Sequence, residues 1–140
     1  MTKLIHEVFS ELEQRENDHD RLAVLRFNQT WALKNVLKGA FDPNVEFAID
    51  VPEYKKQNTP VGLGYSSIHQ ELGRAYLLEK NNPRVDRNLK PDRKKQILIQ
   101  ILEALEDKEA EIFANMIRKD LKVKGLTYEL VKEAFPDLLP

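Results

Sequence analysis

The sequence predicts an all-α fold of about seven helices, arranged in two halves around an irregular middle loop at residues 42–65. Two observations lead to this prediction. Leucine, isoleucine, valine and phenylalanine recur at intervals of three and four residues along most of the chain. The interruptions coincide with proline, glycine and polar clusters. The chain has 140 residues, 41% of them hydrophobic, which suffices for a single domain over residues 1–140 with a basic linker at residues 83–92.

The first part of the chain predicts three helices. The first spans about residues 2–15, where Thr2 can serve as the N-cap. The polar run at residues 17–20 ends it and can cap a short second helix. The third helix begins at Trp31 and ends near residues 39–41. The apolar positions that define them are Leu4, Ile5, Val8, Phe9, Leu12, Leu22, Leu25, Trp31, Leu33, Val36, Leu37 and Ala40.

The middle loop lacks helical periodicity. Val45, Phe47 and Ile49 alternate with polar or small residues, which is typical of a short extended piece. A loop of this length in a small domain is often functional. The residues that disfavour a long helix here are Pro43, Pro52, Pro60, Gly62 and Gly64.

The second half predicts four more helices. The first of them ends near Lys80, and the last ends at Pro136. Polar side chains mark their starts: a Ser67–Gln70 capping box, Asp92, Glu106 and, after Gly125, Thr127. Their apolar positions are Ile68, Leu72, Ala75, Tyr76, Ile97, Leu98, Ile101, Leu102, Leu105, Ile112, Phe113, Met116, Ile117, Leu130, Val131 and Ala134.

Charge is sorted into blocks, although the net charge is only −1. Residues 1–20 and 100–115 each carry a net charge of −4, whereas residues 84–99 carry +4. The near-neutral total argues against a histone-like coat but leaves a local nucleic-acid site open. Cysteine is absent, which excludes disulfides and thiolate sites and fits a cytoplasmic location. We expect no membrane span, because charges interrupt every apolar run well before 18 residues.

Common catalytic motifs are missing from the sequence. It has no P-loop, no Gly-rich dinucleotide turn and no paired-histidine metal motif, so we expect no enzyme, cofactor or metal. We expect Trp31 to pack in the core rather than serve as a ligand platform, while Phe41 and Phe47 are compatible with exposure or with pinning the loop. Acidic clusters could form a metal or acid–base site, but we favour solvated helix faces. The acidic residues concerned are Glu7, Glu11, Glu13, Glu103, Glu106, Asp107, Glu109 and Glu111.

The C-terminal part carries the most informative pattern. A basic helix end, Arg118 to Lys124, leads through Gly125 into a helix that Thr127 can cap. Such a turn presents backbone N–H groups at the positive end of a helix dipole, with Lys122 and Lys124 beside them. Two interpretations stay open: a phosphate-binding seat, or an ordinary helix corner with a solvated basic end.

This segment resembles the end of the N-terminal DNA-binding domain of ATP-dependent DNA ligases, particularly the T-even bacteriophage type. The shared features are Arg118-Lys119-Asp120-Leu121, the turn at Gly125, the capped short helix and the Phe135-Pro136 close, although one extra residue here separates Leu121 from Gly125. The likeness covers roughly residues 20–50 and 95–140. The opening stretch, residues 1–6, is also similar to that of small tailed-phage proteins.

The resemblance implies a stand-alone, phage-encoded module that binds double-stranded DNA, intact or nicked, in the host cytoplasm. Binding would run through the sugar–phosphate backbone. The chain has no Lys-x-Asp-Gly adenylation motif, so ligation through an AMP-lysine intermediate is not expected. The implied DNA contacts are Arg118, Lys119, Lys122, Lys124, Gly125 and Thr127, with Lys34 and Lys38 as weaker candidates. The linker cations that can extend the footprint are Lys90, Arg93, Lys94 and Lys95.

Two other hypotheses remain. The chain could be a protein-interaction module, an adaptor or inhibitor of a replication or transcription complex, that uses the acidic faces at residues 7–20 and 103–111. It could also be a structural or virion component. Phosphate-mediated DNA binding differs from both, because it is tolerant of sequence and sensitive to salt.

Overall fold

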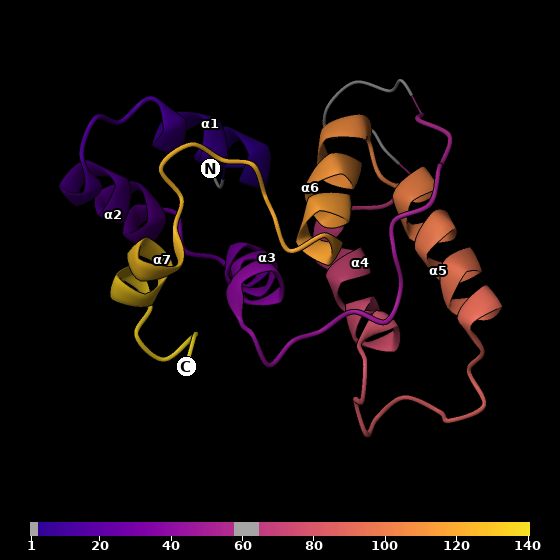
Figure 1. Ribbon diagram of the computed structural model, residues 1–140. Helices are drawn as coiled ribbons and strands as arrows, with labels where there is room; N and C mark the ends of the chain where they lie inside the picture. The colour runs from indigo at the N-terminus through magenta and orange to yellow at the C-terminus, as the bar shows by residue number, and fades with distance from the viewer. Residues whose placement is uncertain (1–2, 58–64) are drawn as a thin grey trace.

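The computed structural model describes residues 3–57 and 65–140. Within these residues the fold is all-α, with seven α-helices, one 3₁₀ helix and no β-strand (Figure 1). The prediction of an all-α fold with about seven helices is therefore confirmed. In chain order the elements are α1 (Ile5–Glu13), α2 (Asp18–Phe27), α3 (Trp31–Phe41), α4 (Ile68–Leu72), η1 (Ala75–Leu78), α5 (Pro91–Ala104), α6 (Asp107–Ile117) and α7 (Tyr128–Ala134).

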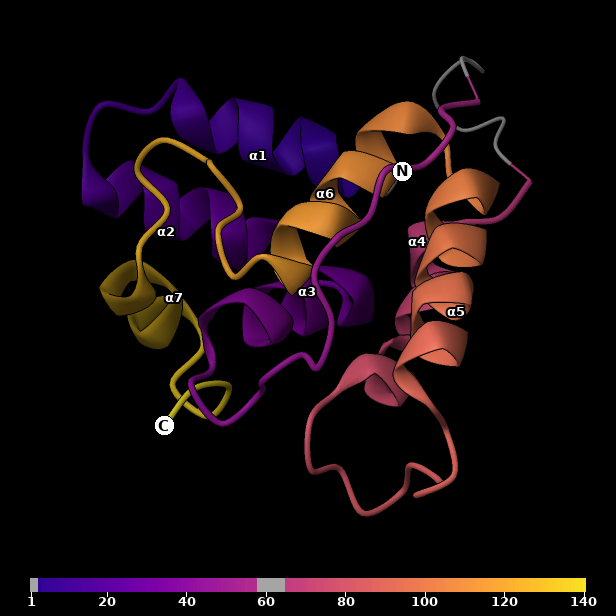
Figure 2. The same ribbon diagram turned by 45° about the vertical axis from the view of Figure 1, so that its right-hand side comes forward.

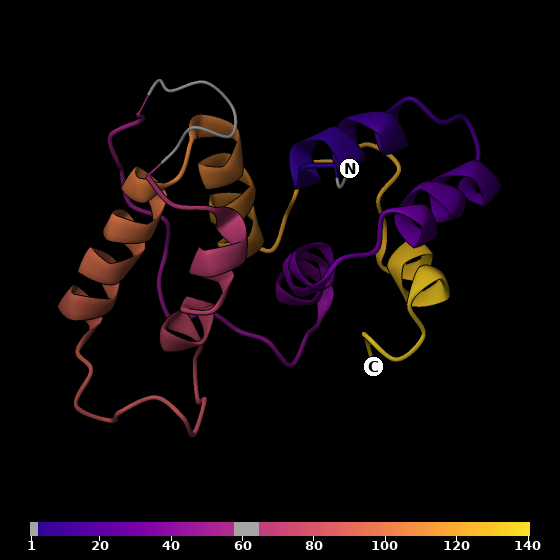
Figure 3. The same ribbon diagram turned by 180° about the vertical axis from the view of Figure 1, so that it is seen from behind.

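The helices form two groups that meet where α3 packs against α6 (Figure 1). In one group, α1 packs against α2, and α2 packs against the C-terminal helix α7. In the other, α4 and α5 both pack against α6. Figure 3, from behind, shows the yellow α7 beside the indigo N-terminal helices, far from it in sequence. The two ends of the chain thus build one group together.

The core is built from the apolar stripes of these helices. Leu12, Leu25, Leu37 and Leu98 are completely buried, and so is Phe113 of α6. Burying a leucine or phenylalanine side chain contributes about 1.5–3 kcal/mol. None of the helices among residues 3–57 and 65–140 is both long and apolar enough to cross a membrane.

Side-chain caps begin several helices as predicted. The side chain of each cap accepts a backbone N–H that the first helical turn leaves unpaired. These caps are Asn17 (2.9 Å from Asp20 N), Ser67 (3.3 Å from Gln70 N), Glu106 (2.8 Å from Glu109 N) and Thr127 (3.1 Å from Leu130 N). The Ser67–Gln70 capping box is also confirmed.

Two of the predicted caps are not among these. The expected cap Asp92 is wrong: α5 begins at Pro91, one residue earlier, with Lys90 at the N-cap and no side-chain cap. Proline suits that first position because its fixed φ is already helical. The expected cap Thr2 lies outside the described residues, and the carboxylate of Glu7 accepts the Leu4 N–H at 2.9 Å instead.

The helix predicted to continue to Lys80 is wrong beyond Leu72. α4 ends there, and η1 turns the chain toward the extended piece that includes Phe47. Two backbone hydrogen bonds join them, from Ala48 N to Leu78 O at 2.8 Å and from Lys80 N to Glu46 O at 2.7 Å. These bonds between distant segments of the chain replace the hydrogen bonds that a continued helix would make. A local sequence pattern therefore could not predict that the helix ends at Leu72. The short extended piece expected at residues 45–49 is limited to a single bridge of Phe47 with Glu79, because the backbone bends at residues 48 and 49.

Candidate functional site

The predicted phosphate seat lies in the connection between α6 and α7. This segment climbs from the end of α6 to α1 and then descends to α7 (Figure 1). It opens with Lys119 in the left-handed region at φ 63°. Lys119 N donates to Met116 O and Asp120 N donates to Asn115 O, each at 3.0 Å. This pair of bonds is the usual way to close a helix C-terminus, although the left-handed position is normally glycine.

The Lys119 side chain is anchored by hydrogen bonds. Its ammonium donates to three backbone carbonyls at the end of α3: Gly39 at 2.7 Å, Asp42 at 2.8 Å and Val45 at 2.6 Å. It also lies 5.9 Å from the ring centre of Phe47. Three acceptors fill the three donors of an ammonium. Lys119 therefore fastens the α6 end to the α3 end, and we leave it out of any phosphate interface.

The other residues predicted for this seat are only partly brought together. Arg118 bonds the side chain of Asn115 at 2.9 Å, and the Thr127 hydroxyl is occupied as the α7 cap. Gly125 has φ +85° and lies against the Arg21 side chain, whose Nε would be 2.5 Å from an added Cβ.

Lys122 and Lys124 are exposed in the same connection. However, the Lys124 N–H donates to the carboxylate of Glu13 at 3.1 Å, so an acid lies beside them.

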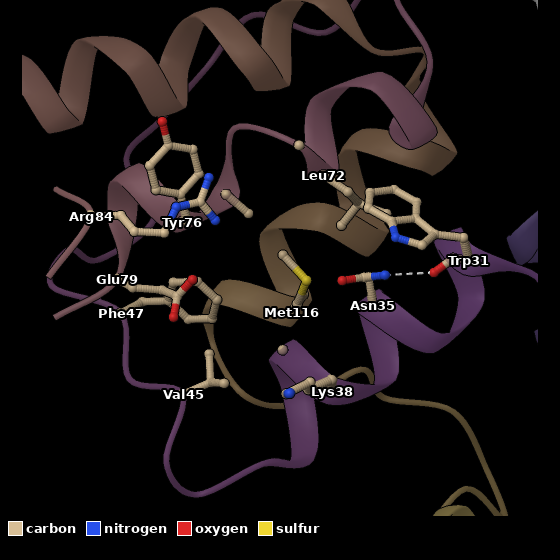
Figure 4. Close-up of a pocket in the computed structure, with 13 residues that line it drawn as sticks. Trp31, Asn35, Lys38, Val45, Phe47, Leu72, Tyr76, Glu79, Arg84 and Met116 are labelled. Atoms are coloured by element: carbon tan, nitrogen blue, oxygen red, sulfur yellow. Dashed lines mark hydrogen bonds between the residues drawn. The ribbon is translucent and has the colours of Figure 1, made fainter. Parts of the chain in front are cut away.

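Lys34 and Lys38 both lie on α3. The Lys34 ammonium stands 5.2 Å from the ring centre of Phe135, near the end of the chain. Lys38 borders a separate pocket between α3, η1 and the extended piece (Figure 4). Lys119, Lys122 and Lys124 line one hollow in the α6–α7 connection, whereas Lys34 and Lys38 border other pockets.

The pocket beside Lys38 has a volume of about 330 Å³. Met116 and Leu72 supply apolar lining (Figure 4). Glu79 and Arg84 lie on one side, and Trp31 and Asn35 lie opposite them. Apolar side chains combined with a few charged and polar groups are typical of small-molecule sites.

Trp31 corrects our expectation of a core residue. Its side chain is 50% exposed, because it occupies the first position of α3 beyond the packed stripe. The indole contacts the His69 ring on α4, with ring centres 4.8 Å apart. The Asn35 amide donates to the Trp31 carbonyl at 2.8 Å, which leaves the Asn35 oxygen facing the pocket (Figure 4).

Opposite Trp31, the Arg84 guanidinium stacks over Tyr76, with Cζ 4.4 Å from the ring centre. Glu79 lies beside them (Figure 4). Burial is the main cause that raises the pKa of Glu79, opposed by a hydrogen bond from Asn82 and by the charges of Lys38, Arg84 and Lys119. This side of the pocket therefore holds a carboxylate and a planar cation next to each other.

Arg84 also belongs to a basic segment, residues 80–95, which comprises the connection between η1 and α5, projecting beyond the helices, and the start of α5 (Figure 2). Two turns shape it, because the side chains of Asn82 and Asp86 accept the N–H groups of Arg84 (2.9 Å) and Asn88 (2.8 Å). Leu89 packs against the core. The segment carries two carboxylates, Asp86 and Asp92, and seven cations: Lys80, Arg84, Arg87, Lys90, Arg93, Lys94 and Lys95.

Two members of the predicted acidic faces are buried instead of solvated. Glu106 is 2% exposed, and Glu109 is 6% exposed. Glu106 caps α6, and Glu109 accepts the N–H of Ile68, the first residue of α4, at 2.7 Å. Burial raises the pKa of Glu109, the bond from Ile68 opposes that shift, and the charge of Glu106 adds to it. These two carboxylates complete helix ends, so the expected solvated face at residues 103–111 is wrong for them.

No pattern in the sequence marks Glu79 and Tyr76 as site residues. Their positions follow from the η1 turn and its pairing with Phe47, which no local pattern indicates. The one sequence feature that pointed to this region was the excess of cations at residues 84–99, which include Arg84.

A metal centre is not indicated in the described parts of the chain. Residues 3–57 and 65–140 contain no group of three or more histidine or acidic side chains that could hold a metal ion.

Comparison with known proteins gives the family of this chain. No curated protein matches it. Residues 8–123 match a family of unknown function, and this match spans from α1 to the segment that follows α6. The chain therefore belongs to the family of unknown function DUF6433.

Proposed function

We propose that this protein is a non-catalytic module that binds double-stranded DNA through its phosphate backbone, with the basic segment as its main contact. The observation that carries the proposal is the density of cations there: seven among sixteen consecutive residues. Among residues 3–57 and 65–140, no ion pair joins any of the seven to a carboxylate. Unpaired cations on a projecting segment favour phosphate contacts.

Local structure supports the same location. α5 begins inside the basic segment, so the positive end of its dipole adds to the side-chain charges. One of the two carboxylates, Asp86, already accepts the Asn88 N–H at 2.8 Å. The proposal thus keeps the DNA-binding role that the ligase resemblance implies. It places the main contact in the basic segment instead of the α6–α7 connection. Lys122 and Lys124 remain a secondary candidate contact.

A salt titration tests the proposal. Fluorescence anisotropy of a labelled 20-base-pair duplex, intact or nicked, would follow binding from low to physiological salt. The logarithm of the affinity should fall linearly with the logarithm of the salt concentration. The triple variant Lys90→Glu, Arg93→Glu, Lys94→Glu should lower the magnitude of that slope by about three, since each phosphate contact contributes about 0.9.

The matched control is Lys122→Glu with Lys124→Glu, which reverses charge in the α6–α7 connection. We expect it to change the slope less than the triple variant. An unchanged slope in the triple variant would remove the basic segment from the interface, and no binding at low salt would refute DNA binding. A preference for nicked over intact duplex would favour the ligase-like mode.

A protein-interaction role is the second candidate, and one exposed side chain favours it. Phe27 at the end of α2 is 88% exposed and borders a groove with Glu11, Arg15 and Asp20. A large apolar side chain that is exposed beside a groove suits contact with a partner protein. A partner protein that binds the parent protein but not the Phe27→Ser variant would support this role. Equal binding of that partner to the parent and the variant would argue against it.

A further inference from the structure

The pocket between α3 and η1 has the chemistry of a nucleobase site. Its apolar lining includes Met116 and Leu72, and its edges carry the Glu79 carboxylate, the Asn35 amide oxygen and the Arg84 guanidinium (Figure 4). A nucleobase has two apolar faces and a polar edge, so it can satisfy both sets of groups at once. Recognition of unpaired bases commonly combines stacking on aromatic or guanidinium planes with hydrogen bonds to base edges.

Other ligand classes fit this pocket less well. A free phosphate would find the cations of Lys38 and Arg84, but it would leave the apolar lining uncovered and would be repelled by the Glu79 carboxylate. A purely apolar ligand would cover Glu79 and Asn35 without giving them hydrogen-bond partners, which is costly. The cavity volume of about 330 Å³ lies at the lower end of the range for small-molecule sites. A single base therefore matches the pocket in size as well as polarity.

The connection to the basic segment indicates where such a base would come from. Arg84 stacks on Tyr76 at the pocket wall and is also one of the seven cations of residues 80–95. A nucleic-acid backbone along that segment would pass the pocket opening. We propose that the pocket receives one unpaired nucleobase, preferably guanine, from a DNA backbone held by the basic segment. The choice of DNA as the source rests on the proposed function.

Guanine is favoured by the acceptors in the pocket. Its pairing edge carries two adjacent N–H donors, whereas thymine presents one N–H between two carbonyl oxygens. A carboxylate has two oxygens that can accept such a pair, and Glu79 provides it. Asn35 adds a further acceptor, because its nitrogen is occupied by the Trp31 carbonyl. Lys38 can then donate to the guanine carbonyl or to a neighbouring phosphate.

Trp31 supplies a built-in reporter for this site. It is the single tryptophan of the chain, it lines the pocket, and it is half exposed. The experiment titrates the full chain with a 20-base-pair duplex, and with the same duplex carrying one unpaired guanine or one unpaired thymine. Guanosine monophosphate and thymidine monophosphate are titrated separately. Anisotropy of labelled DNA reports binding, and Trp31 emission from unlabelled titrations reports occupation of the pocket.

We expect the duplex with unpaired guanine to bind at least ten-fold more tightly than the fully paired duplex and to quench Trp31. Unpaired thymine should give little of that gain. In Glu79→Gln, the preference for guanine over thymine should fall about ten-fold, because an amide offers one acceptor and one donor. Glu53→Gln makes the same chemical change at an exposed residue that does not line this pocket and should behave like the parent.

The outcomes separate the two proposals. Equal affinity for all three duplexes with unchanged Trp31 emission would overturn the nucleobase site and leave DNA binding intact. Quenching by guanosine monophosphate without binding of any duplex would keep the nucleobase site and overturn DNA as its source. No response to any probe would overturn both. An unchanged guanine preference in Glu79→Gln would remove Glu79 from recognition and overturn the assignment of guanine.

Discussion

The ammonium of Lys119 lies 2.6 Å from the carbonyl oxygen of Val45, a residue 74 positions earlier in the chain. The same ammonium bonds the carbonyls of Gly39 and Asp42, which the end of α3 leaves without helical partners. The side chain of this one lysine thereby donates to the carbonyls at the C-terminus of α3, while its backbone N–H closes the C-terminus of α6. This dual use explains why a lysine occupies a left-handed position, where a non-glycine residue costs about 1–2 kcal/mol.

Replacing Lys119 should therefore destabilise the fold. We expect Lys119→Met to lower the free energy of unfolding by about 2 kcal/mol, the typical contribution of hydrogen bonds to a charged group. Lys122→Met is a close control, because Lys122 also has a left-handed backbone, at φ 57°, but its ammonium makes no hydrogen bond to a carbonyl of residues 3–57 or 65–140. Urea unfolding measures both. Equal loss in the two variants would mean that the three carbonyl contacts contribute nothing.

Glu106 should contribute through its cap on α6. Its carboxylate accepts the N–H groups of Glu109 at 2.8 Å and Lys108 at 3.0 Å. Loss of a cap typically costs about 1–2 kcal/mol, and we expect this for Glu106→Ala. Glu111→Ala, an exposed position on the same helix, should change stability by no more than about 0.5 kcal/mol. Similar denaturation midpoints for the two variants would contradict the capping role.

Stability should depend on pH through Glu109. Burial raises its folded-state pKa above the ordinary value of 4.5, so the folded chain holds this proton more tightly than the unfolded chain. The contribution of Glu109 to stability is then greatest below pH 4.5 and falls as pH rises through the raised pKa. Glu109→Gln removes this titration and keeps an oxygen to accept the Ile68 N–H.

Urea unfolding at several pH values from 4 to 8 checks this expectation. The loss of stability with rising pH should be smaller in Glu109→Gln than in the parent. Some dependence should remain, since burial also raises the pKa of Glu79. A variant with the same pH dependence as the parent would show that Glu109 titrates alike in both states.

How far the sequence could predict this structure depends on the range of each interaction. Asn17 and Thr127 were predictable caps, because each bonds a backbone N–H three residues ahead. Lys119 was not, since its partners lie 74 to 80 positions away. Charged residues are exposed by default, so the burial of Glu109 required knowing that α4 begins against α6. The pocket was unpredictable for the same reason.

The contact between α3 and α6 offers a last prediction. Gly39 lies against Met116, and a Cβ added to Gly39 would lie 2.6 Å from the Met116 sulfur and 2.8 Å from its Cγ. Alanine is better than glycine in an isolated helix by about 1 kcal/mol. Here we expect Gly39→Ala to destabilise by about 1–3 kcal/mol, because overpacking outweighs that preference.

A double-mutant cycle with Met116→Ala separates the two effects. Met116→Ala alone should cost about 2–5 kcal/mol, because it empties a buried position. In that background the added methyl group of Gly39→Ala has room, so the substitution should become neutral or stabilising. The resulting coupling energy should exceed about 1 kcal/mol, well above the error of additivity for independent sites. If the two single effects simply add, the helices α3 and α6 can adjust to the extra methyl group without strain. Gly39 would then not be required for the close approach of α3 and α6.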